Sequence, residues 1–248
     1  MSQLSQSPQD SLVFEDISYS YNGSKQNALH NITLSFQAGQ RVALIGRNGS
    51  GKSTLMLLAN GTLQPDKGSI FFNRTRVRYD KKSLRFLREN VGIVFQNPED
   101  QLFSASVMQD ISLGPLNLGL SEEEARQRVN EVVAFCHLEH LVERPTHALS
   151  GGEKTRVALA GILAMKPRFL FADEITNSLD PWMRNQILSI LNNWVAQGNT
   201  VVLSIHDWKL AEAWGEKVIW LDTGKILKSG SASEVFTNAE LPDIPPFN

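Results

Sequence analysis

The stretch from Gly46 to Thr54, which reads G-R-N-G-S-G-K-S-T, has the residue types and the spacing of a phosphate-binding loop. One apolar run ends at Ile45 and another begins at Leu55, so the glycines lie where a buried strand is expected to pass into a helix. Glycines let successive backbone N–H groups curl around an anion, and the following helix adds the positive end of its dipole. The stretch therefore predicts a nucleotide phosphate site.

Two side chains of this loop add chemistry that a tight turn would not need. Lys52 places a positive charge against the outer phosphates, worth about 4 kcal/mol at roughly 4 Å and an effective dielectric constant near 20. The Ser53 hydroxyl can bind Mg²⁺. If the glycines served only a strand-to-helix turn, nothing would explain why lysine and serine follow them. The loop residues expected to contact nucleotide are Gly46, Asn48, Gly49, Ser50, Gly51, Lys52, Ser53 and Thr54.

Polar residues also follow three other apolar runs that have the length of buried strands. Gln96 follows residues 91–95, and the pair Asp173 and Glu174 follows residues 169–172. His206 lies just beyond residues 200–204. The carboxyl ends of strands in an α/β sheet are a usual place for ligand contacts. Taken alone, Gln96 could be a solvated loop residue and His206 an ordinary surface histidine.

Beside a phosphate loop, the polar groups at these strand ends can be given separate roles. Asp173 can hold Mg²⁺, usually through water, and Glu174 can polarise an attacking water molecule. The His206 imidazole could reach a terminal phosphate. Tyr21, next to the Asn22-Gly23 turn, could stack on an adenine ring, although its position alone equally fits an ordinary buried or surface tyrosine.

A second candidate anion site lies far along the chain, at Ser150, Gly151 and Gly152. A helix is expected over residues 154–165, and it would place these three residues at its N-terminus. A simple N-cap needs the serine but not two glycines, which weaken a first helical turn. The whole segment 98–165 is expected to be helical, and Cys136 falls on its apolar spacing as core filler.

Composition indicates an ordinary globular protein rather than a nucleic-acid-binding or membrane-spanning one. The chain has 248 residues, of which 42% are hydrophobic and 20% charged, and its net charge is −2. A nearly neutral chain has no basic field that would favour nucleic acid as a partner. A single cysteine forms no internal disulfide, so a reducing cytoplasm is expected. Apolar runs fall short of the ~20 residues that cross a bilayer.

The remaining patterns outline the elements around these motifs. Residues 11–36 alternate in polarity around a turn and predict antiparallel strands, with a further short strand over 69–72. Asp180 before Pro181 predicts the start of a helix that ends at Gly198. A short helix is expected over 207–214, followed by a hairpin of 217–221 with 225–228.

The order and spacing of these motifs resemble those of the ATP-binding cassette ATPases over residues 12–236. The resemblance implies an α/β P-loop NTPase fold with a mostly parallel core sheet, an N-terminal antiparallel β subdomain and an inserted α-helical subdomain. It makes residues 46–54 the Walker A motif, Gln96 the Q-loop and residues 149–153 the signature. Residues 169–174 match Walker B, 177–180 the D-loop and His206 the switch histidine.

The same resemblance assigns roles and boundaries as expectations. The expected catalytic residues are Glu174, His206 and Lys52. The residues expected to hold Mg²⁺ are Ser53, Gln96 and Asp173. The residues expected to bind ATP in addition to the phosphate loop are Tyr21, Gln96, Ser150, Gly151, Gly152 and Asp180. The expected division is a disordered tail over 1–10, a catalytic core over 11–97 and 166–236, a helical signature subdomain over 98–165 and a C-terminal tail over 237–248.

A finer similarity, in Asn60-Gly61 and in residues 95–103, is to the ATPase subunits of energy-coupling-factor importers, which take up cobalt, nickel, biotin and other vitamins. It implies a second ATPase subunit, identical or paralogous, a transmembrane coupling subunit and a substrate-binding membrane subunit, with the chain peripheral on the cytoplasmic face of the membrane. Departures from the common cassette pattern are Glu153 where glutamine is usual, Ile175 where proline usually follows the catalytic glutamate, and Asn177-Ser178 where Ser-Ala is frequent. Ile175 leaves open how rigidly Glu174 is aimed.

Other classes of protein with a phosphate loop fit less well. A soluble cassette ATPase that acts as an assembly scaffold is the main alternative, and co-purification with an integral membrane protein would decide against it. Chromosome-maintenance ATPases insert long coiled coils between the Q-loop and the signature, where this chain has no sustained heptads. A P-loop kinase has no use for residues 149–152 or His206, and translation-type cassettes carry each motif twice.

Overall fold

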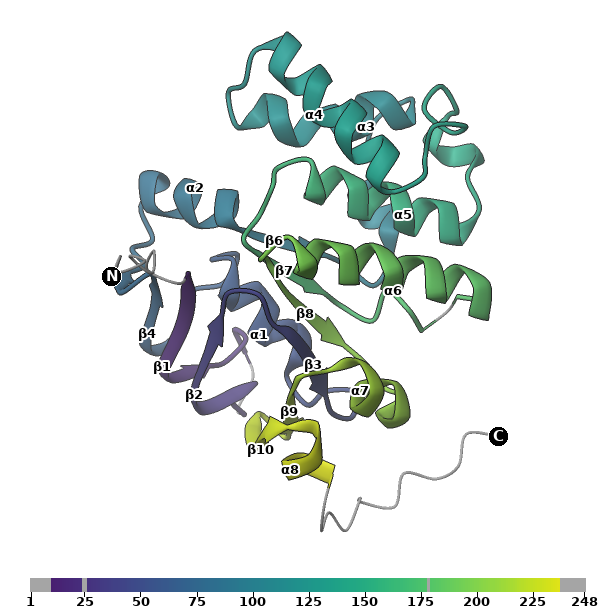
Figure 1. Ribbon diagram of the computed structural model, residues 1–248. Helices are drawn as coiled ribbons and strands as arrows, with labels where there is room; N and C mark the ends of the chain where they lie inside the picture. The colour runs from purple at the N-terminus through teal and green to yellow at the C-terminus, as the bar shows by residue number, and fades with distance from the viewer. Residues whose placement is uncertain (1–9, 24–25, 178, 237–248) are drawn as a thin grey trace, which may run out of the picture.

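The chain forms two sheets and a separate group of helices, as a computed structural model of residues 10–23, 26–177 and 179–236 shows (Figure 1). Residues 1–9 of the predicted tail 1–10, the predicted tail 237–248 and the D-loop residue Ser178 lie outside these described residues. Asp10 is described, and its carbonyl and carboxylate accept from the Ala38 N–H and from Asn73, so the predicted tail is one residue too long. In chain order the elements are β1 (Ser11–Tyr19), β2 (Leu29–Gln37), β3 (Arg41–Ile45), α1 (Lys52–Ala59), β4 (Lys67–Phe72), β5 (Thr75–Arg76), α2 (Lys81–Asn90), β6 (Val91–Val94), the 3₁₀ turn η1 (Pro98–Gln101), α3 (Val107–Asn117), α4 (Glu122–Phe135), the 3₁₀ turn η2 (Thr146–Ala148), α5 (Gly151–Leu163), β7 (Phe169–Ala172), α6 (Pro181–Ala196), β8 (Thr200–Ser204), α7 (Trp208–Trp214), β9 (Lys217–Asp222), β10 (Lys225–Ser231) and α8 (Ala232–Phe236).

The core sheet is mostly parallel. Within the described residues its strand order is β10-β9-β3-β8-β7-β6, and all neighbours are parallel except the edge pair β9 and β10. β3, β6, β7 and β8 are almost continuously apolar because both faces of the sheet are covered. Parallel pairing brings the carboxyl ends of β3, β8, β7 and β6 to one edge.

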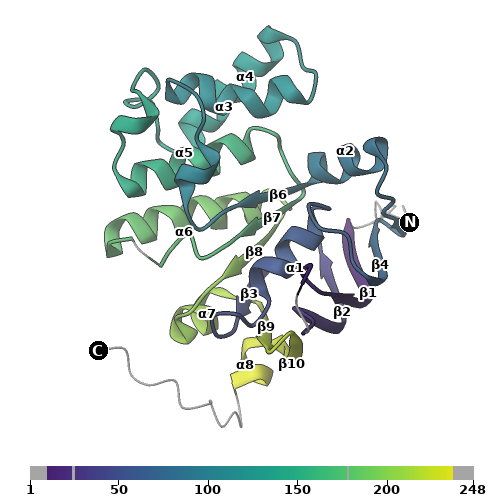
Figure 2. The ribbon, with the colours of Figure 1, turned by 180° about the vertical axis from the view of Figure 1, so that it is seen from behind.

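The N-terminal sheet is antiparallel, as the alternating pattern predicted. In the described part of the chain its order is β2-β1-β4-β5. Its buried face and one face of the core sheet enclose α1, which is buried on most sides (Figure 2). Phe36 of β2 meets Phe171 of β7 edge to face, with ring centroids 5.4 Å apart. The helix that follows the phosphate loop is therefore fixed between two sheets.

The other face of the core sheet carries α6, and beyond it lie α3, α4 and α5, grouped at the side away from the antiparallel sheet (Figures 1 and 2). The expectation that residues 98–165 are helical throughout is wrong in detail. Irregular segments separate η1, α3, α4 and α5, because the chain must turn back between antiparallel helices. The signature helix is α5, and it begins at Gly151 rather than at Lys154.

Two helices were not predicted. α2 presents only Leu87 as a fully buried residue, so its apolar stripe is too narrow to stand out, although Asp80 caps it by accepting from the N–H groups of Lys82 and Ser83. α8 is a five-residue helix. In the described ranges, no helix is both long enough and apolar enough to cross a membrane.

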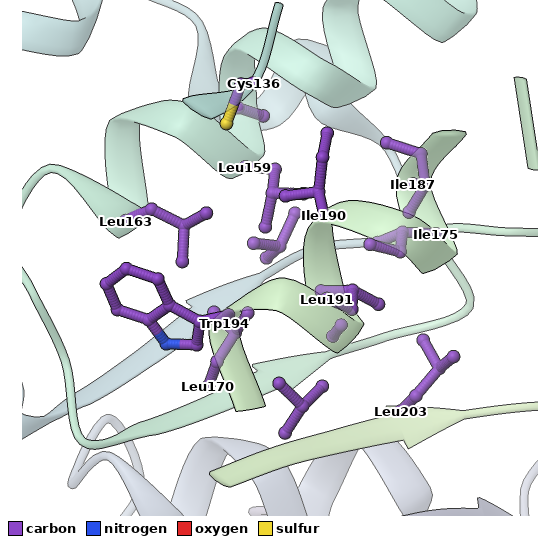
Figure 3. Close-up of a cluster of buried hydrophobic side chains, with 14 of the residues drawn as sticks. Cys136, Leu159, Leu163, Leu170, Ile175, Ile187, Ile190, Leu191, Trp194 and Leu203 are labelled. Atoms are coloured by element: carbon purple, nitrogen blue, oxygen red, sulfur yellow. The ribbon is translucent and has the colours of Figure 1, made fainter. Parts of the chain in front are cut away.

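Cys136 lies in the apolar cluster between α4, α5 and α6, as its spacing predicted (Figure 3). Burial raises the pKa of its thiol to about 12. At pH 8 the thiolate fraction is then on the order of 10⁻⁴, and only the thiolate attacks a disulfide reagent. We expect 5,5′-dithiobis(2-nitrobenzoate) to label the folded protein far more slowly than the protein in 6 M guanidinium, as measured by absorbance. Equal labelling rates would contradict the buried placement.

Candidate functional site

The phosphate loop has the backbone that its glycines were expected to provide. Gly46 has φ 156°, and a Cβ there would overlap the Leu221 carbonyl oxygen and lie 2.6 Å from Ser50 Oγ. Gly51, the residue before α1, has φ 106°, where a Cβ would meet Leu29 and the Ala28 carbonyl. Neither position accepts a side chain without displacing the backbone, so both glycines are required by the loop.

The loop is held in place by the turn between β9 and β10. The Gly224 N–H donates to the Ser50 carbonyl over 2.9 Å, and the His30 N–H donates to the Gly224 carbonyl over 2.8 Å. The Ser50 hydroxyl is buried and has no hydrogen-bond partner among the described residues. A buried hydroxyl of this kind is costly to leave unsatisfied, so an anion in the loop would give it an acceptor.

Lys52 is the central cation of the site and only 5% exposed. Its Nζ donates to the carbonyls of Gly46 and Arg47 over 2.9 and 3.3 Å and lies 3.3 Å from Glu174 Oε1. An ammonium has three donors, and all three find oxygens inside the protein. To bind a phosphate, Lys52 must exchange some of these partners for phosphate oxygens.

Glu174 contacts residues from two other segments, Lys52 and His206, and one from its own turn, Asn177. His206 Nε2 lies 2.6 Å from Glu174 Oε1, and Asn177 Nδ2 donates to Glu174 Oε2 over 3.1 Å. The Glu174 side chain is 11% exposed. Its backbone is left-handed, with φ 53°, a conformation that is strained for a residue with a side chain.

Ile175 follows Glu174 at the position where the common cassette pattern has proline, and its packing fixes how Glu174 is oriented. The Ile175 side chain is buried beside Ile187 and Leu191 of α6 (Figure 3). The Asn177 N–H also donates to the Glu174 carbonyl over 3.1 Å, which closes the turn. Apolar packing and a turn thus hold the backbone of Glu174 without a proline.

Ser53 and Asp173 form the pair that could hold a metal ion. Ser53 Oγ donates to Asp173 Oδ2 over 2.5 Å. The other carboxylate oxygen, Oδ1, is buried and has no hydrogen-bond partner in the described structure. A hydroxyl beside a carboxylate with a free oxygen is a suitable donor set for Mg²⁺.

Tyr21 lies beside the loop. Its hydroxyl is 3.1 Å from Thr54 Oγ1, and its ring packs edge to face on Tyr19 with centroids 5.0 Å apart. The side chain remains 45% exposed, so part of the ring is open to another group. Its predicted role in stacking on adenine is a proposal.

Ser150 caps α5 through a capping box: its hydroxyl accepts from the Glu153 N–H, and its own N–H donates to Glu153 Oε2 over 2.7 Å. That backbone hydrogen bond, followed by the Ser150 side chain and the Arg144 and Arg156 charges, lowers the pKa of Glu153 against the opposing effect of burial. The signature thus contains an ionised carboxylate, held by Arg144 at 3.4 Å. Gly151 has open space where a Cβ would be.

A cleft of about 510 Å³ joins Gln96 to the signature glycines and to Glu174. Its described lining residues are Gln96, Asn97, Pro98, Glu99, Asp100, Gly151, Gly152, Lys154, Thr155, Glu174, Ile175 and Leu179, and none belongs to the phosphate loop. The signature and the phosphate loop of one chain therefore do not share this cleft. Asp180 also stays outside it, because its carboxylate caps α6 by accepting from the N–H groups of Trp182 and Met183.

The sequence did not indicate two sets of contacts that hold the segment after Gln96. Gln101 accepts from the Phe95 N–H over 2.8 Å and donates to the Ile93 carbonyl over 3.0 Å, so it fixes the segment after Gln96 to the end of β6. Glu99 pairs with Lys154 of α5, and a hydrogen bond from Lys154 lowers the pKa of Glu99. The run 95–103 was noted for its similarity, but no local pattern indicates which of its residues make these contacts.

A protein-family model described as "ABC transporter" matches residues 29–177. The chain belongs to the ABC transporter family and is an ABC ATPase. It is 44% identical over 230 residues to the energy-coupling factor transporter ATP-binding protein EcfA2 of Methanospirillum hungatei, covering 93% of this chain and 58% of that protein. It is 44% identical over 227 residues to the cobalt import ATP-binding protein CbiO of Rhodobacter capsulatus, covering 92% of this chain and 81% of that one.

Two solved structures resemble the fold of this ABC ATPase closely. CbiO1 from Clostridium perfringens, described as part of the ABC transporter complex CbiONQ, has 39% identity and a TM-score of 0.83 over 92% of this chain and 90% of its own. The ATP-binding cassette MJ0796, solved as a dimer in a post-hydrolysis state with ADP and Pi, has 27% identity and a TM-score of 0.81 over 89% of this chain and 98% of its own. These likenesses confirm the predicted cassette fold and the energy-coupling-factor resemblance.

Proposed function

We propose that this ABC ATPase is the ATP-binding subunit of an energy-coupling-factor type importer, in which two cassettes hydrolyse ATP and drive uptake of cobalt, nickel or a vitamin such as biotin. The observation that carries the proposal is the separation of the two anion sites: Lys52 lies in the phosphate loop, and no described residue of that loop lines the cleft that Gly151 and Gly152 share with Glu174. A second cassette, packed head to tail, would supply its signature to this phosphate loop. The names of the relatives above support the importer class.

In the proposed reaction, the backbone of residues 46–51 and Lys52 bind the phosphates of ATP. Phosphate oxygens draw Lys52 away from Glu174 Oε1, and this frees the carboxylate that Lys52 neutralises in the present structure. Glu174 then accepts a proton from, or orients, the attacking water, with Asn177 holding its second oxygen. His206, 2.6 Å from Glu174, is placed to donate to the γ-phosphate once Glu174 turns to water.

Ser53 and Asp173 are the residues we propose to hold Mg²⁺, together with Gln96, which lines the cleft that Glu174 also borders. When bound, Mg²⁺ would neutralise negative charge on the phosphates of ATP. Asp173 is fixed by its N–H, which donates to the Val94 carbonyl of β6 over 2.9 Å. The carboxylate is thus positioned before any ion arrives.

Replacing Asp173 with asparagine is expected to abolish the Mg²⁺-dependent tightening of nucleotide binding, because the neutral amide removes the charge opposite Ser53. Titration of a fluorescent N-methylanthraniloyl-ATP analogue with and without Mg²⁺ measures this directly. Chelation of Mg²⁺ should weaken binding by wild-type protein to the level of Asp173→Asn. An undiminished Mg²⁺ effect in the variant would remove Asp173 from the site.

The segment that follows Gln96 offers the proposed docking surface for a transmembrane subunit. Phe103 is 78% exposed, and Leu113 and Leu116 of α3 are also exposed. Burial of a phenylalanine side chain stabilises an interface by about 1.5 to 3 kcal/mol, so an apolar surface of this size is costly to leave uncovered. Glu99 and Lys154 connect the same segment to α5, so movement of a docked partner would reach the signature helix.

Affinity purification of the tagged chain from detergent-solubilised membranes tests the importer proposal. We expect an integral membrane protein to co-purify, and Phe103→Ser to reduce its yield severalfold. Leu227→Ser removes another exposed apolar side chain, from β10, and serves as the control. Purification of the chain with no membrane protein, from cells that express it with its own gene neighbours, would favour the scaffold class instead.

A further inference from the structure

A second cavity, of about 430 Å³, lies at the end of α5 opposite to Ser150. It opens where α4 and the end of α5 meet α6 and the residues just before β7 and β8. Its described lining residues are Arg128, Glu131, Val132, Phe135, Leu163, Ala164, Lys166, Arg168, Trp194, Gln197 and Asn199. Neither the nucleotide site nor the proposed membrane dock shares any of these residues.

One wall of this cavity is apolar and partly aromatic. Phe135 of α4 and Trp194 of α6 pack edge to face with ring centroids 5.8 Å apart. Leu163 lies beside the Trp194 ring, at the edge of the apolar cluster that also holds Cys136 (Figure 3). Aromatic faces of this kind bind planar or aliphatic groups by burying area.

The polar wall carries more positive than negative charge. Lys166 and Glu131 pair over 2.8 Å and neutralise each other. Arg128 donates to the carbonyls of Ala164 and Met165, over 3.5 and 3.3 Å, and forms no ion pair within 4 Å among the described residues, although its charge helps to lower the pKa of Glu124 and Glu131. Arg168 Nε lies 3.4 Å from Asp10, at the long end of the range for an ion pair.

A hydrogen-bond donor lies buried behind this wall. Trp194 is 7% exposed, and its Nε1 is buried without an acceptor in the described structure, so a ligand would reach it only if the indole ring shifted. Among the described lining residues of the cavity, three side chains are cationic, Arg128, Lys166 and Arg168, against one carboxylate, that of Glu131. The lining therefore favours an anion.

We propose that this cavity binds a small organic anion, with a carboxylate facing Arg128 and an apolar body against Phe135 and Leu163. An inorganic anion would satisfy the guanidinium but leave the aromatic wall uncovered. A neutral apolar molecule would cover the wall but leave Arg128 without a direct ion pair. Only a molecule with both parts matches both walls.

The position of the cavity gives such a ligand a structural effect. Arg128 and Phe135 belong to α4, in the helical subdomain, whereas Trp194 belongs to α6, on the core sheet. A ligand that contacts both elements stabilises one orientation of the helices relative to the sheet. The 13-residue helix α5, about 20 Å long at 1.5 Å per residue, joins the cavity to Ser150 at its other end.

The test uses ¹⁹F NMR of the full chain labelled with 5-fluorotryptophan, with the Trp194 resonance assigned from Trp194→Phe. Benzoate is the probe, benzyl alcohol its uncharged analogue, and inorganic phosphate the anion without an apolar body. We expect benzoate to shift the Trp194 resonance saturably and the two controls to leave it unmoved. Arg128→Gln should weaken benzoate binding about tenfold, because a charge-assisted hydrogen bond is lost.

Arg126→Gln, which removes a charge from the exposed side of the same helix, is the matched control and should bind benzoate as the wild type does. Arg168→Gln is the second variant should Arg128→Gln fail to fold, and it too should weaken binding. The proposal is overturned if benzoate leaves Trp194 unmoved, if benzyl alcohol or phosphate shifts it as strongly, or if folded Arg128→Gln binds benzoate unchanged.

Discussion

Glu174→Gln is expected to hydrolyse ATP about 10² to 10⁴ times more slowly than wild type while still binding it, because an amide cannot accept the proton of the attacking water. Glutamine keeps the size of the side chain and can still accept from Asn177. The variant also loses the negative charge beside Lys52, so the ammonium is free to meet phosphate without first leaving a carboxylate. Nucleotide affinity should therefore be equal to or higher than that of wild type.

Phosphate release measures the rate, and equilibrium binding of labelled ATP measures the affinity. Glu216→Gln is the control, because it removes a carboxylate that pairs with Arg41 over 2.9 Å at the surface and touches no residue of the nucleotide site. That change should leave the rate unaltered. Normal turnover by Glu174→Gln would exclude the proposed role of Glu174.

Gly151→Asp is expected to lose hydrolysis without losing the fold, and it tests whether a second chain completes the site. Within this chain a Cβ at Gly151 meets nothing within 4 Å, and an acidic residue in the first helical turn is electrostatically favourable. The change is therefore harmless to an isolated chain. In a head-to-tail dimer the new carboxylate would face the γ-phosphate held by the partner and repel it.

We expect ATP-driven dimerisation, followed by light scattering, to fail in this variant while ATP binding by the isolated chain persists. Gly161→Asp is the matched control, since Gly161 lies on the same helix and also has open space at its Cβ position. Mixing Gly151→Asp with Lys52→Ala should restore up to about a quarter of the wild-type rate, because half of randomly formed dimers hold one intact composite site. A per-molecule rate that stays constant on extreme dilution would contradict the composite site.

The strands and their functional ends could be predicted because the information is local. β3, β7 and β8 are short apolar runs, and each is followed within a few residues by the polar group that matters, at Lys52, Asp173 and His206. Parallel strands in one sheet must deliver these groups to one edge. The weaker prediction over 98–165 failed in its boundaries because amphipathic spacing marks a helix but does not show where the chain turns between helices.

Contacts between distant residues could not be predicted from spacing. Glu99 and Lys154 are 55 residues apart, and each looks like an ordinary solvated charge in its own segment. The cavity beside Trp194 is formed by α4, α5, α6 and the starts of two strands, none of which carries a motif for it. Such sites depend on how elements pack, and packing has no signature in a short window of sequence.

The sequence alone determined the phosphate loop, the polar groups at the strand ends and the order of the cassette motifs, because each depends on backbone geometry within one short segment. Only the tertiary structure decided that Lys52, His206 and Asn177 converge on Glu174, and that the signature glycines line a cleft apart from the phosphate loop. The physical reason is range: a glycine turn or a cap is fixed by neighbours along the chain, whereas an ion pair or a cavity is fixed by neighbours in space.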